Sequence, residues 1–421
     1  TLTNGMKVIV KEDRRAPSAV HMVWYRSGAM DEPDGVSGVA HVLEHMMFKG
    51  TKEVGPGEFN KRVAAVGGRD NAFTSKDYTA YFQQVPPQRL GDMMALEADR
   101  MKNLVISDEA FRRELEVVKE ERRLRTDDQP NAKAFELFRA MAYPASGYHT
   151  PTIGWMADLE RMTVEELRAW YQAWYAPNNA TLVVVGDVTK DEVRGLAEQY
   201  FGAIPRRDVP PAKLPRELAE PGERRLTLHV KTQLPSLLMG FNVPGLATSA
   251  DAHQVHALRL IAALLDGGYS ARLPANLERG EELVSGASAS YDAFQRGDSL
   301  FLLSATPNVQ KGKTLEQAEA GLWRQLEALQ KTPPSAAELA RVRAQVIAGL
   351  VYERDSITSQ ATTIGALETV GLSWTLMDQD LAALEAVTPA DIQQAAQTFF
   401  TRSRLAVAHI LPENPAEGAQ P

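Results

Sequence analysis

Two histidines and a glutamate near the start of the chain have types and a spacing that suit metal-dependent hydrolysis. They lie in His41-Val-Leu-Glu44-His45, in a stretch that has no proline or glycine after Gly38 and favours a helix. On a helix, residues i and i+4 lie one turn apart on one side, so both imidazoles can reach one cation. Glu44 points to that side and could act as a base toward a water molecule there. The order is the inverse of the His-Glu-x-x-His zinc motif; the alternative is an amphipathic helix that carries two histidines by chance.

A second segment could supply a further ligand. The sequence predicts a helix over 108–126, with Ser107 as its N-cap and acids in its first turn. One face of this helix would carry Ala110, Glu114, Val117, Glu121 and Leu124. Glu114 and Glu121 thus occupy positions where an amphipathic helix has apolar side chains, and a buried carboxylate needs a partner such as a cation. Two acids paired with arginines at the helix margin would explain the pattern equally well.

Other helices and strands must position these two segments. Hydrophobic periodicity in the first half predicts helices at about 36–48, 58–66, 87–105, 108–126 and 163–174, and strands at 69–75, 78–85 and 180–186. The second half predicts a helix near 250–265, strands within 283–306, four helices between 313 and 400, and a last strand at 404–410. Helices and strands do not alternate strictly, which favours an α+β sandwich over a doubly wound sheet.

The two halves of the chain begin in the same way. Val8-Ile-Val-Lys-Glu precedes a strand that starts with Pro17-Ser, and Leu228-His-Val-Lys-Thr precedes one that starts with Pro235-Ser. This repetition predicts a divergent duplication. We therefore expect an α+β protein with two homologous α/β-sandwich domains, each a mostly antiparallel sheet packed with helices.

A polar, proline-rich stretch separates the two halves. We expect a zinc-binding catalytic domain at 1–207, a linker at 208–223, and a second domain at 224–421 that lacks the metal site. The tail 412–421 is expected to lack fixed structure.

Composition excludes several classes of protein. The 421 residues include no cysteine, so disulfides and thiolate metal sites are excluded. The net charge is −8 and arginines such as those in 112–125 alternate with glutamate, so nucleic acid is not an expected partner. No apolar run approaches the roughly 18 residues of a membrane span. We expect a soluble protein of the bacterial periplasm or cytoplasm, a choice that the sequence leaves open.

At this point the sequence resembles the pitrilysin/insulinase family of peptidases over most of its length. The resemblance is carried by the helix motif between Gly38 and Thr51, by 67–82 (GGRDNAFTSKDYTAYF), by 114–121 (ELEVVKEE) and by 177–187 (PNNATLVVVGD). It implies zinc held by His41, His45 and Glu121, with Glu44 as general base and Glu114 as a supporting acid. It also implies that an extended peptide adds as a strand along the edge Asn71, Ala72, Phe73 and Thr74.

One departure from the family pattern concerns partners. Active members usually carry an arginine and a tyrosine, seven residues apart, after a Ser-Arg-Leu segment in the second half of the partner half-molecule. This chain has Ser270-Ala-Arg-Leu, but Asn276 and Leu283 stand at the corresponding positions. Heterodimers of the family, such as the mitochondrial processing peptidase, divide the site between a zinc subunit and a zinc-less one.

The resemblance therefore implies a zinc-dependent endopeptidase subunit that cuts peptides or small unfolded polypeptides inside a closed chamber. A zinc-less homologous partner is expected, and a homodimer is the second choice. The alternative function is a structural or assembly subunit that keeps the fold without the activity.

The remaining histidines are expected to be structural. The pair His253 and His256 lies on a predicted helix but has no glutamate at the required step. His21, His229 and His409 lie among apolar strand residues. His149 lies in a loop and has no assigned role. We interpret the run 46–48 (MMF) as core packing.

Overall fold

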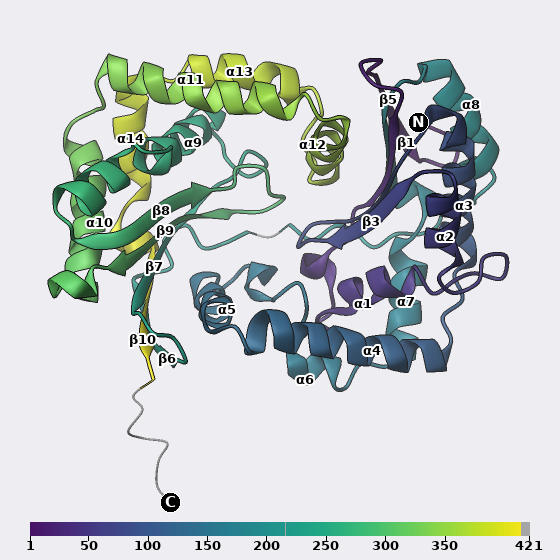
Figure 1. Cartoon of the computed structure of the whole chain (residues 1–421), viewed down its shortest axis with the longest axis horizontal. Helices are drawn as coiled ribbons and strands as arrows, with labels where there is room; N and C mark the ends of the chain where they lie inside the picture. Colours follow the sequence, from purple (N-terminus) through teal and green to yellow (C-terminus); the bar gives the residue numbers. More distant parts are fainter. Residues whose placement is uncertain (215, 414–421) are drawn as a thin grey trace, which may run out of the picture. The chain divides into compact units, whose positions relative to one another are not determined.

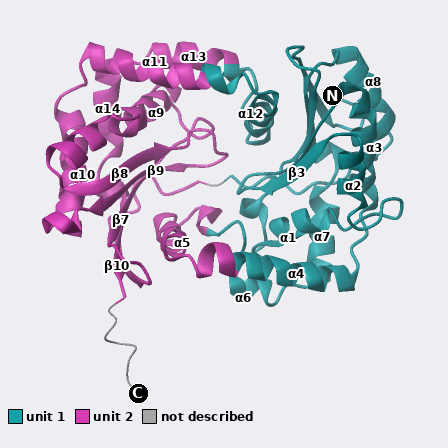
Figure 2. Ribbon diagram, viewed as in Figure 1, with its two compact units in different colours: residues 1–122, 150–214, 351–377 teal, residues 123–149, 215–350, 378–421 magenta. Residues whose placement is uncertain are grey.

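The computed structural model describes residues 1–214 and 216–413. It divides into two compact units, coloured separately in Figure 2. Unit 1 comprises residues 1–122, 150–214 and 351–377, and unit 2 comprises 123–149, 215–350 and 378–421. The predicted tail falls mainly on 414–421, which lies outside the described residues, as does residue 215 of the predicted linker.

Unit 1 is built on a five-stranded mixed sheet. The strand order is β1-β5-β2-β4-β3, in which β1 pairs with β5 in parallel and the other neighbours are antiparallel. The bounds are β1 Lys7–Glu12, β2 Ala19–Tyr25, β3 Arg69–Thr74, β4 Thr79–Val85 and β5 Ala180–Gly186. Strand β3 is one edge of this sheet, so its outward main chain has no neighbouring strand among the described residues.

Helices pack on both faces of this sheet. Alternate residues of its central strands point to opposite faces. On β2, Val23 and Tyr25 pack into the main core with the helices that follow in the first half, whereas Met22 and Trp24 pack against α12. These helices are α1 Val39–Met46, α2 Glu58–Ala65, α3 Leu90–Asn103, α4 Asp108–Arg122, α6 Met156–Leu159, α7 Val164–Trp174 and α8 Lys190–Phe201, with α12 at Ile357–Thr369 (Figure 1).

Unit 2 repeats the same topology. Its strand order is β6-β10-β7-β9-β8, which matches the first sheet strand for strand. The bounds are β6 Arg224–Val230, β7 Ser236–Val243, β8 Val284–Tyr291, β9 Ser299–Pro307 and β10 Leu405–Pro412, with helices α5 Pro130–Ala142, α9 Ala252–Asp266, α10 Leu315–Lys331, α11 Ala336–Glu353, α13 Leu376–Glu385 and α14 Pro389–Phe399. The expected α+β class and the duplication are thereby confirmed.

The units exchange segments relative to the contiguous halves 1–207 and 224–421 of the sequence. Helix α12, from the second half, packs on the first sheet, where a Cβ on Gly365 would come within 2.0 Å of Trp24. Helix α5, from the first half, belongs to unit 2, where Asn242 of β7 donates to the Ala142 carbonyl at 2.9 Å. Each sheet therefore receives one helix from the other half of the chain, which hydrophobic periodicity does not reveal.

Three details of the sequence prediction are wrong. Helices α5, α6 and α8 lie outside the helices that the sequence predicts, although Thr189 caps α8 by accepting from the Glu192 N–H. Five helices, not four, lie between 313 and 400 in the described chain. The predicted face of α4 is only partly the buried one: Glu114 is buried as expected, but Val117 and, just after the helix, Leu124 are exposed. Phe111, Leu115 and Val118 form the buried apolar face instead.

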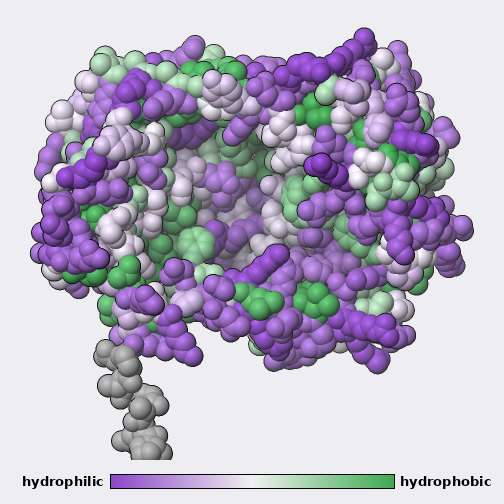
Figure 3. All heavy atoms as spheres, viewed as in Figure 1, coloured by the Kyte–Doolittle hydropathy of each residue, from purple (hydrophilic) through white to green (hydrophobic). Residues whose placement is uncertain are grey.

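The predicted linker carries no helix or strand among its described residues. Lys213 donates to the Glu32 carbonyl in unit 1, and the Glu217 N–H donates to Asp298 in unit 2. No helix in the described residues is long and apolar enough to cross a membrane. On the face shown in Figure 3, hydrophilic residues predominate and hydrophobic ones form small scattered groups.

Candidate metal centre

Helix α1, which carries the histidine motif, is fixed at its first turn by a buried acid. Glu32 accepts from the N–H groups of Gly38 and Ala40, both at 2.9 Å. These are donors that the start of a helix leaves without an internal partner. Burial raises the pKa of Glu32 to about 8, against the opposing effect of the two N–H donors. Gly38 has a φ of 91°, and Gly154 lies so close to it that a side chain at either position would clash.

Three of the predicted ligands converge. Glu121 Oε2 lies 3.3 Å from His45 Nε2 and 3.7 Å from His41 Nε2. The two imidazole rings meet edge to face, with centroids 4.7 Å apart. One ligand atom from each of His41, His45 and Glu121 lies within 4.8 Å of the others, and no other such group of three occurs in the described part of the chain. Two nitrogens and one carboxylate oxygen form the donor set of a catalytic zinc site with one position left for water.

Glu114 supports one of these ligands. Its Oε1 lies 2.9 Å from His45 Nδ1, which leaves Nε2 of that ring directed at Glu121. Its other oxygen lies 2.6 Å from Lys49 Nζ. Burial would raise the pKa of Glu114, but the bonds from His45 and Lys49 outweigh it and lower that pKa. A carboxylate bonded to the far nitrogen of a ligating histidine fixes the ring and its tautomer.

The electrostatics of the centre favour a cation. Burial opposes a proton on His45, yet its bond to Glu114 and the charge of Glu121 raise its pKa above the usual value. The negative groups that hold a proton there would also attract a metal ion, which competes for the same nitrogen.

Glu44 precedes His45 on α1 and contacts the edge of the sheet. It accepts a hydrogen bond from the Thr74 hydroxyl at 2.5 Å, and Thr74 is the last residue of edge strand β3. Beneath it lie two buried phenols, Tyr81 and Tyr175, whose oxygens are 2.7 Å apart. Burial raises the pKa of both phenols, and the charge of Glu44 adds to the effect. The segment 71–74 therefore presents a free strand edge next to an acid that can serve as a base.

The positions expected for the arginine and tyrosine pair have other roles in unit 2. Asn276 donates to Gln325 at 2.8 Å, and Leu283 is buried in the hydrophobic core. Arg272 of the Ser-Ala-Arg-Leu segment forms a two-bond ion pair with Glu338. These three side chains therefore do not provide the arginine and tyrosine pair of the family pattern.

Four of the other six histidines contact structural partners, and His229 is exposed on β6. His21 bonds to Gln83, His253 to Asp391 and His409 to Glu319. His256 is buried beside Arg259, which is paired with Asp380. Met46 and Met47 are buried, so core packing is confirmed for that run.

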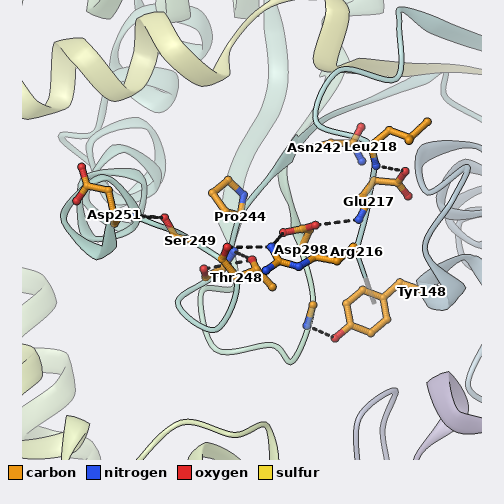
Figure 4. A network of polar contacts seen from close by, with 12 residues as sticks. Tyr148, Arg216, Glu217, Leu218, Asn242, Pro244, Thr248, Ser249, Asp251 and Asp298 are labelled. Carbon is orange, nitrogen blue, oxygen red and sulfur yellow. Dashed lines mark hydrogen bonds and ion pairs between the residues drawn. The ribbon is translucent and has the colours of Figure 1, made fainter. Parts of the chain in front are cut away.

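Unit 2 contains a separate cavity of about 350 Å³ beside the start of α9. Figure 4 shows its polar lining, in which Glu217 and Asp298 are bonded to each other through the Glu217 N–H and Arg216 faces Asp298. The Glu217 carboxylate also accepts from the main-chain N–H groups of Ala145 and Ser146. Its acids are thus already engaged within the protein.

Comparisons with known proteins show which family the chain belongs to. The model of the insulinase family (peptidase family M16) matches residues 7–154, and that of the peptidase M16 inactive domain matches 161–346. The zinc protease PqqE of Helicobacter pylori is 32% identical over 86% of this chain and 81% of its own. The chain belongs to the M16 family. Among solved structures, a protease from Helicobacter pylori superposes with a TM-score of 0.90 at 28% identity, over 98% of both chains.

More distant M16 relatives match almost the whole chain. The mitochondrial-processing peptidase subunit beta of Blastocladiella emersonii is 25% identical over 98% of this chain and 88% of its own. The first half of the periplasmic protease PqqL from Escherichia coli shares the fold, with a TM-score of 0.82 at 19% identity. The family models and the Helicobacter pylori relative confirm the expected family.

Two residues of the centre escaped the sequence analysis. Lys49 lies one turn after His45, a spacing that could have indicated a charge near the ligands. Glu32 precedes the helix by seven residues, and no local pattern connects it with the Gly38 N–H, because the intervening loop decides that contact.

Proposed function

We propose that this M16 chain is a zinc-dependent endopeptidase subunit that cleaves extended peptides. The observation that supports it most directly is the meeting of His41, His45 and Glu121 around one point, with Glu44 alongside. The names of the zinc protease relatives agree with zinc as the metal.

Each side chain would then have a distinct task. Zinc held by His41, His45 and Glu121 would polarise the scissile carbonyl and lower the pKa of a coordinated water molecule. Glu44 accepts the proton of the attacking water and donates it to the leaving amine. Thr74 orients the Glu44 carboxylate through its hydroxyl, and Glu114 holds the His45 ring.

The substrate would bind through its main chain. An extended peptide that adds to β3 places its backbone along Asn71, Ala72, Phe73 and Thr74 and therefore close to Glu44. Main-chain bonding of this kind tolerates many side chains, so unfolded peptides rather than one sequence are the expected substrate class.

We further propose a partner subunit. The roles of Asn276 and Leu283 leave the chain without the expected substrate-contacting pair, and a zinc-less homologous subunit would supply it. A heterodimer of this kind is preferred, with a homodimer as the second arrangement.

Two measurements test the proposal. Elemental analysis should find about one zinc per chain in the wild type and in Glu44→Gln, and much less in Glu121→Gln. With the partner present, Glu44→Gln should abolish peptide hydrolysis, because a neutral amide cannot take the proton. Hydrolysis retained by Glu44→Gln would remove it from the role of base, and a zinc-loaded wild type inactive with every homologous partner would favour a structural subunit.

A further inference from the structure

The duplication creates two equivalent sheet edges, and one of them, β3, ends at Thr74, which bonds to Glu44 of the candidate site. Strand β8 ends the sheet of unit 2 as β3 ends that of unit 1. Unpaired N–H and C=O groups on such an edge can add a peptide strand. A peptide that binds by strand addition could therefore bind at β8 as well as at β3.

In unit 2 this edge is already occupied by side chains of the protein. The Ala287 N–H donates to Glu278 Oε1 and the Ala289 N–H donates to Asp266 Oδ2, both at 3.1 Å. These two amides are two residues apart, so their N–H groups point to the same side of the strand. Asp266 is the last residue of α9, and Glu278 lies in the irregular helix 273–280 before β8.

The other edge has no such cover. On β3, the Ala72 N–H donates to the Asn71 side-chain oxygen at 2.9 Å. Asn71 is exposed and belongs to β3 itself. No side chain from another element bonds to the main chain of 71–74 in the described residues. An incoming strand would only have to displace the Asn71 side chain from the Ala72 N–H.

We propose that Asp266 and Glu278 close β8 to strand addition, so that extended peptides bind only at β3. The role of β3 in this proposal rests on the proposed function, whereas the closure of β8 does not. A carboxylate accepts from an N–H more strongly than a peptide carbonyl does, since its hydrogen bonds are charge-assisted. An incoming peptide would have to displace two such bonds and bring its own carbonyl oxygens close to two negative charges.

Hydrogen exchange with a peptide probe tests this directly. The full chain carries Glu44→Gln to prevent cleavage, and the probe is an uncharged, end-blocked octapeptide of alternating threonine and glutamine. The edge variant is Asp266→Ala with Glu278→Ala, and the two single variants serve if the pair does not fold. The matched control, Glu281→Ala with Glu327→Ala, removes the same charge from exposed positions of unit 2. Asp266→Asn with Glu278→Gln keeps an acceptor oxygen without the charge.

Without the probe, the amides of Ala287 and Ala289 should exchange about tenfold faster in the edge variant than in the control, because each loses its acceptor. With the probe, residues 285–291 should gain protection in the edge variant only. The amide variant should lie between the two, because it keeps the hydrogen bonds but not the repulsion.

Protection of 285–291 by the probe in the control chain would overturn the proposal, and so would its absence in the edge variant. Protection of 71–74 reports separately on the proposed function. If β8 opens as expected while 71–74 never gain protection, the closure stands and peptide binding at β3 fails.

Discussion

The bond between Glu114 and His45 makes a quantitative prediction about metal affinity. Glu114→Gln keeps an oxygen that can accept from His45 Nδ1 but removes the charge, and Glu114→Ala removes the acceptor altogether. A hydrogen bond to a charged group contributes about 1.5–3 kcal/mol and a neutral one about 0.5–1.5 kcal/mol. The glutamine variant should therefore lose about 1 kcal/mol of zinc binding, or about fivefold in affinity.

The alanine variant should lose more, between about tenfold and a hundredfold, as is usual when the residue that supports a ligating histidine is removed. Lys49, left without its partner 2.6 Å away, would add a positive charge that also disfavours zinc. Competition with a chromogenic zinc chelator at fixed pH measures both constants without any activity assay. Glu116→Gln is the matched control, because Glu116 lies on the same helix and is exposed. Affinities of both Glu114 variants within twofold of the wild type would refute the role given to this residue.

Three further predictions concern the scaffold. Burial raises the pKa of Glu32 to about 8, so folding favours its neutral form and the free energy of unfolding should fall as pH rises from about 4.5 to 8. Glu32→Gln should flatten that decline, as measured by urea denaturation at several pH values. Arg100→Met should cost about 3–5 kcal/mol by the same assay, because it leaves Glu97 buried without its partner, whereas Arg62→Met in the exposed pair with Glu58 should cost less than about 1 kcal/mol. Equal losses would contradict this reasoning. Gly365→Ala should destabilise the protein by about 1–3 kcal/mol, since its Cβ would overlap Trp24. Gly349→Ala, where a Cβ meets open space, should stabilise the protein slightly. Thermal unfolding distinguishes the two variants, and an unchanged stability of Gly365→Ala would show that α12 can shift.

Much of the fold could be predicted from local patterns. Strands such as β2 and β5 have apolar residues on both faces, and helices such as α7 begin with a clear capping box at Thr163. Helix α8 also begins with an N-cap residue, Thr189, which predicts the start of this helix from the sequence alone. The buried face of α4 differs from the predicted one, because Glu114 is buried along with Phe111, Leu115 and Val118. Glu121 lies off this face, beside His41 and His45.

Other features had no local signal. Helix α12 is buried on several sides because it packs on the sheet of the other half, so its pattern does not separate it from its neighbours. The bonds of Glu32 to Gly38 and Ala40, and of Asp266 to Ala289, join residues of different elements.

The sequence alone determined that one turn of a helix carries two possible metal ligands and a possible general base. The four-residue step between His41 and His45, with Glu44 between them, follows from helix geometry and requires nothing else. Only the tertiary structure decided that Glu121 meets these histidines and that Glu114 bonds to both His45 and Lys49. It also decided that the β8 amides of Ala287 and Ala289 are bonded to acids of other elements. The physical reason is that spacing along a helix is set by the backbone, whereas contacts between separate elements depend on how their side chains pack.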